Sequence, residues 1–309
     1  MATPARATAA GVAGLLCLIV VAPSAAQAAD NTPQRTVTPA PPPEIVSSTG
    51  WYGPDSADTI TLFEPAAQGR YPAVIFVHGG AWGRSQPNDS ELKWAHDLAQ
   101  DQGWLVAVIG YPAKVPHEQV VEPRAISYAV NAVAHRSDVD PQSLALWGES
   151  AGAQLALLTA YRDARTLDPL VSGVVSISGP TDMRTEYNSF AEIWLHAVTR
   201  FEGMAPQAAH DSGSRRYSLT SPVDVVSRRS PPTFQAISRL DPLVPPNQVK
   251  VLTQRLIQVG VMHRSVWLQG DGHSSTIEDE TPPGSQYTVQ QLAIAFLNRA
   301  FAQRRVLFG

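Results

Sequence analysis

Cysteine is almost absent from this sequence of 309 residues, which contains only Cys17. Cys17 lies in an apolar N-terminal segment that we expect to be removed, so the mature chain should contain no cysteine. That absence excludes a disulfide framework and a cysteine-based metal site. The eight histidines are scattered, without the His-Glu-x-x-His spacing of a metal centre, so we predict no metal and no cofactor.

An excess of positive charge is lacking as well. The sequence has 23 lysines and arginines against 27 aspartates and glutamates, for a net charge of −4 at pH 7. The basic residues occur in short pairs such as Arg215-Arg216 and Arg304-Arg305, and they form no patch. We therefore predict no nucleic-acid partner. The sequence carries no signal for an oligomeric state.

A long apolar run is found once, at residues 11–22. It follows Arg6 and precedes small residues that end at Ala28, which is the pattern of a secretory signal peptide with an A-x-A cleavage site. The run is shorter than the ~20 residues of a membrane span. We predict a signal peptide at 1–28, export to the periplasm or the medium, and no stable membrane span after cleavage. An uncleaved N-terminal anchor is the alternative.

Residues 29–48 are rich in proline, and a segment of that composition is typical of an extended linker. We predict one domain at 49–309. From residue 50, strand-like apolar runs alternate with helix-like stretches, which predicts an α/β fold: a mostly parallel, twisted sheet with helices on both faces. We expect strands at 71–77, 104–109, 144–147, 171–178, 232–238 and 264–268, and helices at 89–100, 122–134, 247–259 and 286–302 and directly after residue 150.

The regular alternation breaks down at about 181–230, where aromatic residues are mixed with polar residues and prolines. This segment is long for a loop in a compact domain. We interpret it as a cap insertion over the strand ends that lines an acyl or alcohol pocket. The alternative is a peripheral helical segment that does not contact substrate.

The sequence Gly148-Glu149-Ser150-Ala151-Gly152 follows the apolar run 144–147 and precedes a run rich in alanine and leucine. This pattern predicts a strand, a sharp turn and a helix. Gly148 and Gly152 lack the Cβ atoms that would collide in such a turn, so the turn can hold Ser150 in an exposed position. We predict that Ser150 is a nucleophile, and that the N–H of Ala151 at the helix start points to where an oxyanion would form.

A second glycine-containing segment, His78-Gly79-Gly80-Ala81-Trp82, directly follows the predicted buried strand 71–77. Two glycines at the carboxyl end of a strand allow backbone N–H groups to approach a ligand closely, and open α/β sheets bind their ligands at this edge.

Asp241 and His273 also follow predicted strands, at 232–238 and 264–268. Carboxyl ends of parallel strands share one sheet edge, so we expect both side chains near Ser150. Asp241 could instead be a plain turn residue before Pro242. Asp271 is a competing acid, but it lies in the same turn as His273 and would struggle to reach the imidazole. His273 could also be an exposed loop residue.

These motifs, in this order, resemble those of the α/β-hydrolase superfamily, in which the nucleophile, the acid and the histidine follow one another along the chain. More narrowly, the chain is similar to serine esterases with a His-Gly-Gly-x-Trp motif, a group that includes carboxylesterases, acetyl esterases and kynurenine formamidase and has relatives among hormone-sensitive-lipase-like enzymes. Ala81 replaces the third glycine of the lipase-type motif, which disfavours a long-chain lipase. The resemblance covers about 50–301 and rests on the motifs at 78–82, 148–152, 241–245 and 270–273.

The resemblance implies a role for each residue. Ser150 attacks an acyl carbon, His273 transfers the proton and Asp241 orients the imidazole. The oxyanion hole is formed by the backbone N–H groups of Gly79 or Gly80 with that of Ala151. His78 and Trp82 support the oxyanion loop, which is the segment 78–82 that carries Gly79 and Gly80.

The resulting hypothesis is an exported hydrolase that cleaves small carboxylic esters through an acyl-enzyme, with a small-molecule ester as its partner. Two alternatives remain open. One is an amide or peptide hydrolase of the same fold, of the aryl-formamidase or prolyl-peptidase type. The other is a non-catalytic binding module that retains the fold.

Overall fold

The computed structural model describes residues 42–184 and 191–308. The predicted signal peptide, its cleavage site and residues 29–41 of the predicted linker lie outside this range. Within the described ranges, no helix is both long enough and apolar enough to cross a membrane.

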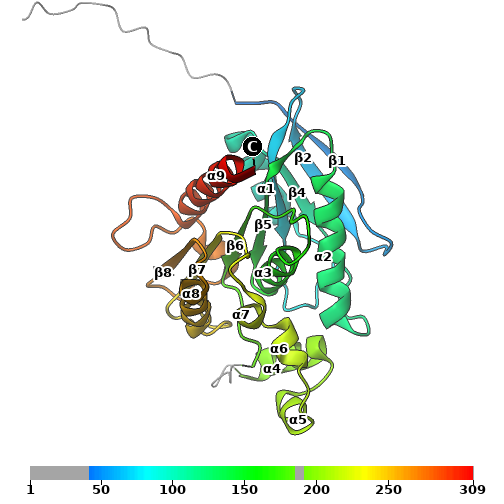
Figure 1. Ribbon diagram of the computed structural model, residues 1–309, viewed down its shortest axis with the longest axis vertical. Helices are drawn as coiled ribbons and strands as arrows, with labels where there is room; N and C mark the ends of the chain where they lie inside the picture. The colour runs from blue at the N-terminus through cyan, green and yellow to red at the C-terminus, as the bar shows by residue number, and fades with distance from the viewer. Residues whose placement is uncertain (1–41, 185–190, 309) are drawn as a thin grey trace, which may run out of the picture. The chain divides into compact units, whose positions relative to one another are not determined.

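The domain is built on an eight-stranded sheet with the strand order β1-β2-β4-β3-β5-β6-β7-β8 (Figure 1). β1 pairs antiparallel with β2, and β2 pairs antiparallel with β4, whereas the strands from β4 to β8 run parallel. The predicted, mostly parallel sheet is therefore confirmed. The strands are β1 (Ile45–Trp51), β2 (Thr59–Pro65), β3 (Tyr71–Val77), β4 (Leu105–Ile109), β5 (Val139–Glu149), β6 (Gly173–Ile177), β7 (Thr233–Ser238) and β8 (His263–Leu268).

Helices cover both faces of the sheet, as predicted, because the parallel strands bury side chains on both sides. Along β3, Ile75 packs into one buried cluster and its neighbour Phe76 into the other. The first cluster includes residues of α2, α3 and α8, and the second includes residues of α1 and α9. The helices are α1 (Asp89–Gln102), α2 (Glu118–Ala134), α3 (Ala151–Asp163), α8 (Asn247–Val259) and α9 (Val289–Phe308), with a short 3₁₀ helix η1 (Ser274–Ile277).

The structure differs from the prediction at the start of the domain. We expected linker up to residue 48, but β1 begins at Ile45 and pairs along its length with β2. The side chains of β1 are exposed or half-buried, so this edge strand lacks an apolar signal in the sequence. α2 also begins at Glu118 instead of 122, so Pro123 lies inside the helix, where its lack of an N–H removes one hydrogen bond of the helix.

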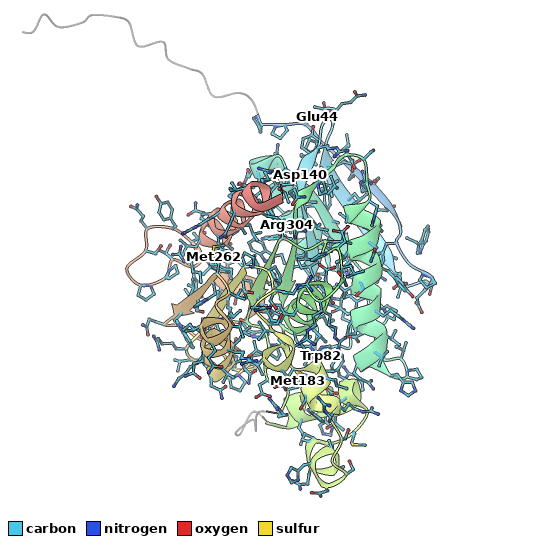
Figure 2. All side chains as sticks on the ribbon, viewed as in Figure 1. Glu44, Trp82, Asp140, Met183, Met262 and Arg304 are labelled. Carbon is cyan, nitrogen blue, oxygen red and sulfur yellow. The ribbon has the colours of Figure 1, made fainter. Side chains whose placement is uncertain are left out.

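The predicted insertion at 181–230 contains α4 (Ala191–Glu202), α5 (Pro206–Asp211), α6 (Arg216–Thr220) and α7 (Pro222–Val225). We call this segment the cap. In Figure 1, α4, α5 and α6 gather at one end of the domain. Trp82 and Met183, both labelled in Figure 2, belong to the same buried cluster as Phe201 of α4. The cap is therefore continuous with the hydrophobic core of the sheet domain.

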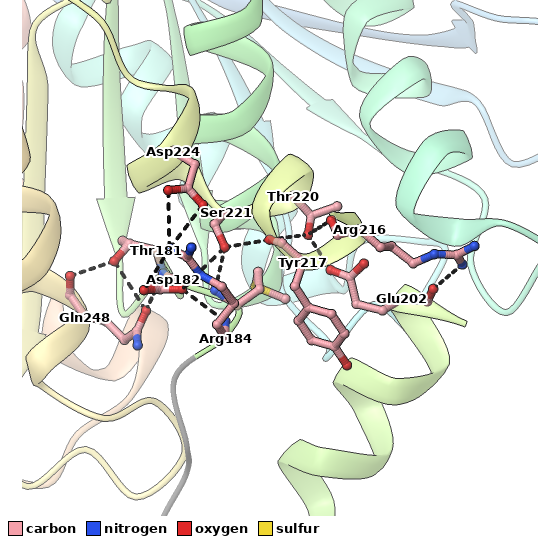
Figure 3. Close-up of polar contacts among 11 residues, drawn as sticks. Thr181, Asp182, Arg184, Glu202, Arg216, Tyr217, Thr220, Ser221, Asp224 and Gln248 are labelled. Carbon is pink, nitrogen blue, oxygen red and sulfur yellow. Dashed lines mark hydrogen bonds and ion pairs between the residues drawn. The ribbon is translucent and has the colours of Figure 1, made fainter. Parts of the chain in front are cut away.

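Hydrogen bonds tie the base of the cap to the rest of the domain (Figure 3). The Thr181 hydroxyl donates to the backbone oxygen of Gln248 in α8 at 2.6 Å, and the Thr181 N–H donates to the Gln248 side chain at 2.7 Å. Near the other end of the cap, the Ser221 hydroxyl accepts from the Met183 N–H at 2.8 Å. The start of the cap is therefore hydrogen-bonded both to α8 and to a residue near the other end of the cap.

The close contact between β3 and α3 generates a prediction. A Cβ atom at Gly152 would lie 2.1 Å from the oxygen of Val77 and 2.3 Å from that of His78, and both are backbone atoms. We expect Gly152→Ala to lower the free energy of unfolding by about 1–3 kcal/mol or more, despite the higher helix propensity of alanine. The measurement is urea denaturation. The control is Gly50→Ala, whose Cβ would contact only Ile60 at 4.0 Å; equal stability of the two variants would contradict the prediction.

Candidate active site

Ser150 lies in a strained turn between β5 and α3. Its φ of 51° and ψ of −122° are sparsely populated for a residue with a side chain, and such strain costs of the order of 1–3 kcal/mol. The turn closes tightly: a Cβ at Gly148 would lie 2.5 Å from the oxygen of Gly152. The Ser150 N–H donates to the oxygen of Ile177 in β6 at 2.9 Å, which secures the turn to the neighbouring strand.

The structure brings together the side chains of Ser150, His273 and Asp241. His273 Nε2 lies 3.0 Å from Ser150 Oγ, although the two residues are 123 positions apart. His273 Nδ1 lies 2.8 Å from Asp241 Oδ2 and 3.0 Å from Oδ1. A carboxylate only accepts hydrogen bonds, so Nδ1 carries the proton and Nε2 can accept from the serine hydroxyl. This geometry suits proton transfer from Ser150 to His273.

Backbone hydrogen bonds hold the Asp241 carboxylate in place. Its side chain is fully buried, and Oδ1 also accepts from the backbone N–H groups of Leu243 and Val244, each at 2.9 Å. Asp271, the competing acid, makes no hydrogen bond to the imidazole in the described part of the chain. Of the two acids, Asp241 is the one that contacts the His273 ring.

The segment 78–82 folds back beside the serine. A Cβ at Gly79 would lie 3.1 Å from Ser150 Cβ, so the backbone at Gly79 runs next to the hydroxyl-bearing side chain. Gly80, Ala81 and Trp82 follow with φ values of 122°, 52° and 54°. Across the turn, Ala151 is the first residue of α3, and an α-helix leaves the N–H groups of its first turn without intrahelical acceptors. Backbone donors of Gly79, Gly80 and Ala151 thus belong to segments that flank Ser150.

His78 and Trp82 brace this loop from inside the protein. The His78 ring stacks on Tyr111 with centroids 4.4 Å apart, its Nδ1 contacts the Gly79 oxygen at 2.7 Å, and the Tyr111 hydroxyl donates to the His78 oxygen at 2.7 Å. The Trp82 indole N–H donates to Gln154 of α3 at 3.0 Å. Burial, partly offset by the contact to Gly79, lowers the pKa of His78 to about 4, so the ring is neutral at pH 7.

The cap contacts the same loop. Trp82 stacks on Phe201 of α4 with ring centroids 4.8 Å apart. The Arg200 guanidinium donates to the Ala81 oxygen at 2.5 Å and pairs with Glu118 of α2 at 3.3 Å. α4 is therefore joined to the loop beside Ser150 by both an aromatic stack and a charge-assisted hydrogen bond.

Sequence reasoning missed a group of charged residues around the serine, in which the glutamates are buried and Arg84 is half-buried. Arg84 donates to the Gly79 oxygen and pairs with Glu91 in α1 at 2.5 Å. Glu149, which precedes Ser150, and Glu278, which follows η1, are almost fully buried. One signal was available: Asn88 and Glu91 have the spacing of a helix capping box, which the structure shows at the start of α1. Among the described residues, no group of three or more potential ligands could hold a metal ion.

Comparison with known proteins identifies the family. The BD-FAE family model matches residues 60–256, which is more than half of the chain and includes Ser150 and Asp241. The chain belongs to the BD-FAE family. His273 lies beyond the matched segment, and the structure alone places it beside the other two residues.

Esterases occur both among the curated relatives of the chain and among the solved structures that share its fold. An esterase of Gibberella moniliformis is 26% identical over 84% of each chain. The probable carboxylic ester hydrolase LipM of Mycobacterium tuberculosis is 26% identical over 62% of this chain, but the match spans 46% of LipM. A truncated carbohydrate esterase from gut microbiota superposes with a TM-score of 0.67 over 83% of this chain and 96% of that one, at 17% identity. Carboxyl esterase 2 of Tuber melanosporum gives a TM-score of 0.64 over 85% and 88%, at 19% identity. The resemblance to α/β-hydrolase esterases that the motifs indicated is confirmed.

The neutral, buried His78 generates a prediction about pH. Its pKa is 6.5 in the unfolded chain and about 4 when folded, so between these values the unfolded chain binds a proton that the folded protein excludes. The free energy of unfolding should therefore fall as the pH falls from 6.5 to 4, and this group should account for up to about 3 kcal/mol. Urea denaturation across this range should show a weaker pH dependence for His78→Phe, which keeps a ring against Tyr111. Parallel curves for parent and variant would contradict the prediction.

Proposed function

We propose that this BD-FAE family protein is an exported serine hydrolase that cleaves small carboxylic esters through an acyl-enzyme intermediate. The observation that carries the proposal is the position of His273 between Ser150 and Asp241, with a hydrogen-bonding distance on each side of the ring. The class of reaction follows from the family and from the esterases that resemble the chain.

In the first half of the reaction, Ser150 Oγ attacks the ester carbonyl carbon while His273 Nε2 takes the hydroxyl proton. The charge on the carbonyl oxygen is stabilised by the N–H groups of Gly79 or Gly80 together with that of Ala151, and one such donor typically contributes about 10²–10³ in turnover. His273 then gives the proton to the departing alcohol, which leaves the acyl group on the serine.

In the second half, water takes the place of the alcohol. His273 removes a proton from the water, which attacks the acyl carbon, and the proton returns to Ser150 as the acid departs. Asp241 keeps Nδ1 protonated throughout and stabilises the imidazolium in each half. The four hydrogen bonds that its carboxylate accepts keep it in place for both steps.

We further propose that the cap contributes to the substrate pocket. The support is its attachment to the oxyanion loop through Trp82, Phe201 and Arg200, because a segment fixed at that point lies within reach of a bound ester. A peripheral cap would leave the acyl preference unchanged when α4 is altered.

The central prediction concerns Ser150. Ser150→Ala should lower kcat/KM for p-nitrophenyl acetate and butyrate by about 10⁴-fold or more, because the acyl-enzyme can no longer form. A fluorophosphonate should add its mass to the parent protein at Ser150 and not to the variant. The control is Ser127→Ala, whose hydroxyl bonds only to the backbone of α2. Equal activity of Ser150→Ala and the parent would refute the proposal.

The same assays separate the alternatives. Faster turnover of aryl-formamides or prolyl amides than of matched esters would make the chain an amide or peptide hydrolase with the same nucleophile. Failure of the fluorophosphonate to react with a folded parent protein would favour a binding module.

The prediction of export depends on the sequence of residues 1–28 and can be tested separately. When the full chain is expressed with a secretion system, the processed protein should start at Ala29, which N-terminal sequencing of the extracellular or periplasmic fraction would show. Recovery of the intact N-terminus in the membrane fraction would instead support an uncleaved anchor.

A further inference from the structure

Two buried glutamates lie behind the candidate active site, one on each of the segments that carry Ser150 and His273. Glu149 directly precedes Ser150 at the end of β5 and is 4% exposed. Glu278 directly follows η1, the 3₁₀ helix that begins after His273, and is 2% exposed. Neither carboxyl group takes part in the mechanism derived above.

Each of these carboxyl groups binds to the segment of the other. Glu149 Oε2 accepts from the backbone N–H of Ser275, in the histidine segment, at 3.1 Å. Glu278 Oε1 accepts from the indole N–H of Trp147, in the strand that leads to the serine, at 2.7 Å. The two contacts are reciprocal, and together they hold the two segments against each other.

Among the described residues, no positively charged side chain forms an ion pair with Glu149 or Glu278. The charged groups that face Glu149 are Glu91, Arg84 and Glu278, and Arg84 is already paired with Glu91. Glu278 faces Glu149 and Asp279. Two adjacent carboxylates in a buried site without a cation of their own cannot both remain ionised. Burial, with a further contribution from Glu91, raises the pKa of Glu149 to about 8, and burial together with Glu149 raises the pKa of Glu278.

We propose that Glu149 and Glu278 form a pair of buried carboxyl groups that positions the segment carrying His273 against the turn carrying Ser150. This inference rests on the proposed function, since it concerns the same hydrolytic site. Both glutamates are positioning residues, because they act through the segments that hold the reacting groups. The Arg84–Glu91 ion pair extends the arrangement to the oxyanion loop, since Arg84 also donates to the Gly79 oxygen.

Activity should then depend on the protonation state of Glu149. As the pH rises past about 8, Glu149 loses its proton and places a second negative charge beside Glu91, whose own charge is already paired with Arg84. The resulting repulsion should loosen the segment that holds His273, so kcat should fall reversibly while KM changes little. A displacement of about 1 Å at a reacting group can lower a rate by about 100-fold.

The first test compares a truncating and an isosteric change. Glu149→Ala removes the acceptor for the Ser275 N–H, and we expect kcat to fall by about 10- to 100-fold with little change in KM. Glu149→Gln keeps an acceptor and carries no charge, so it should restore most of the kcat and abolish the decline above pH 8. Glu278→Gln should likewise flatten the alkaline part of the kcat–pH profile.

The second test measures stability in the same variants. In the parent, the folded protein retains a proton that the unfolded chain releases near pH 4.5, the ordinary pKa of a glutamate side chain. Stability should therefore fall as the pH rises from about 4.5 to 8, and the urea midpoint should depend less on pH in Glu149→Gln and Glu278→Gln. The control is Asp163→Asn, at the end of α3. The Asp163 carboxyl also has a pKa raised by burial and accepts from two backbone N–H groups. This control should change the stability profile and leave the kcat–pH profile unchanged.

Two results would overturn the inference. One is a kcat–pH profile of Glu149→Gln and Glu278→Gln that superimposes on that of the parent. The other is full kcat in a folded Glu149→Ala protein. Either result, combined with inactive Ser150→Ala and labelling at Ser150, would refute only the positioning role. Activity that survives Ser150→Ala would instead refute the proposed function itself.

Discussion

The site depends on one steric constraint, the tight crossing of the β5–α3 turn over the end of β3. Ser150 keeps its strained backbone conformation because Gly148 and Gly152 let the turn and the strand approach to a distance that no side chain would allow. The same approach places Gly79 beside the serine. A conformation that would be unfavourable in a free chain is thus maintained by the packing of the whole sheet, as is common at functional sites.

Much of the fold could be predicted because strands buried on both faces have continuous apolar sequences. The run 71–77 and the helix 247–259 were predicted with the bounds that the structure shows. β1 was missed because an exposed edge strand has no such run, and the predicted boundary at 48 was wrong for the same reason. The convergence of Ser150, Asp241 and His273 followed from the rule that parallel strands end at one edge.

The charged residues behind the site could not be found in this way. Glutamates are exposed in most proteins, so a sequence gives no reason to bury Glu149 or Glu278. The contact between Trp147 and Glu278 joins residues 131 positions apart, and neither belongs to a recognisable pattern with the other. Tertiary packing alone creates this arrangement, and only coordinates can show it.

The stack of Trp82 on Phe201 restrains the movement of α4. Both side chains are fully buried, and swinging α4 outward would expose them to water at a cost of about 1.5–3 kcal/mol each. It would also break the bond from Arg200 to Ala81. α4 is therefore held firmly against the loop 78–82, and under the proposed function the selection among esters would depend on a preformed shape and not on a movement of α4.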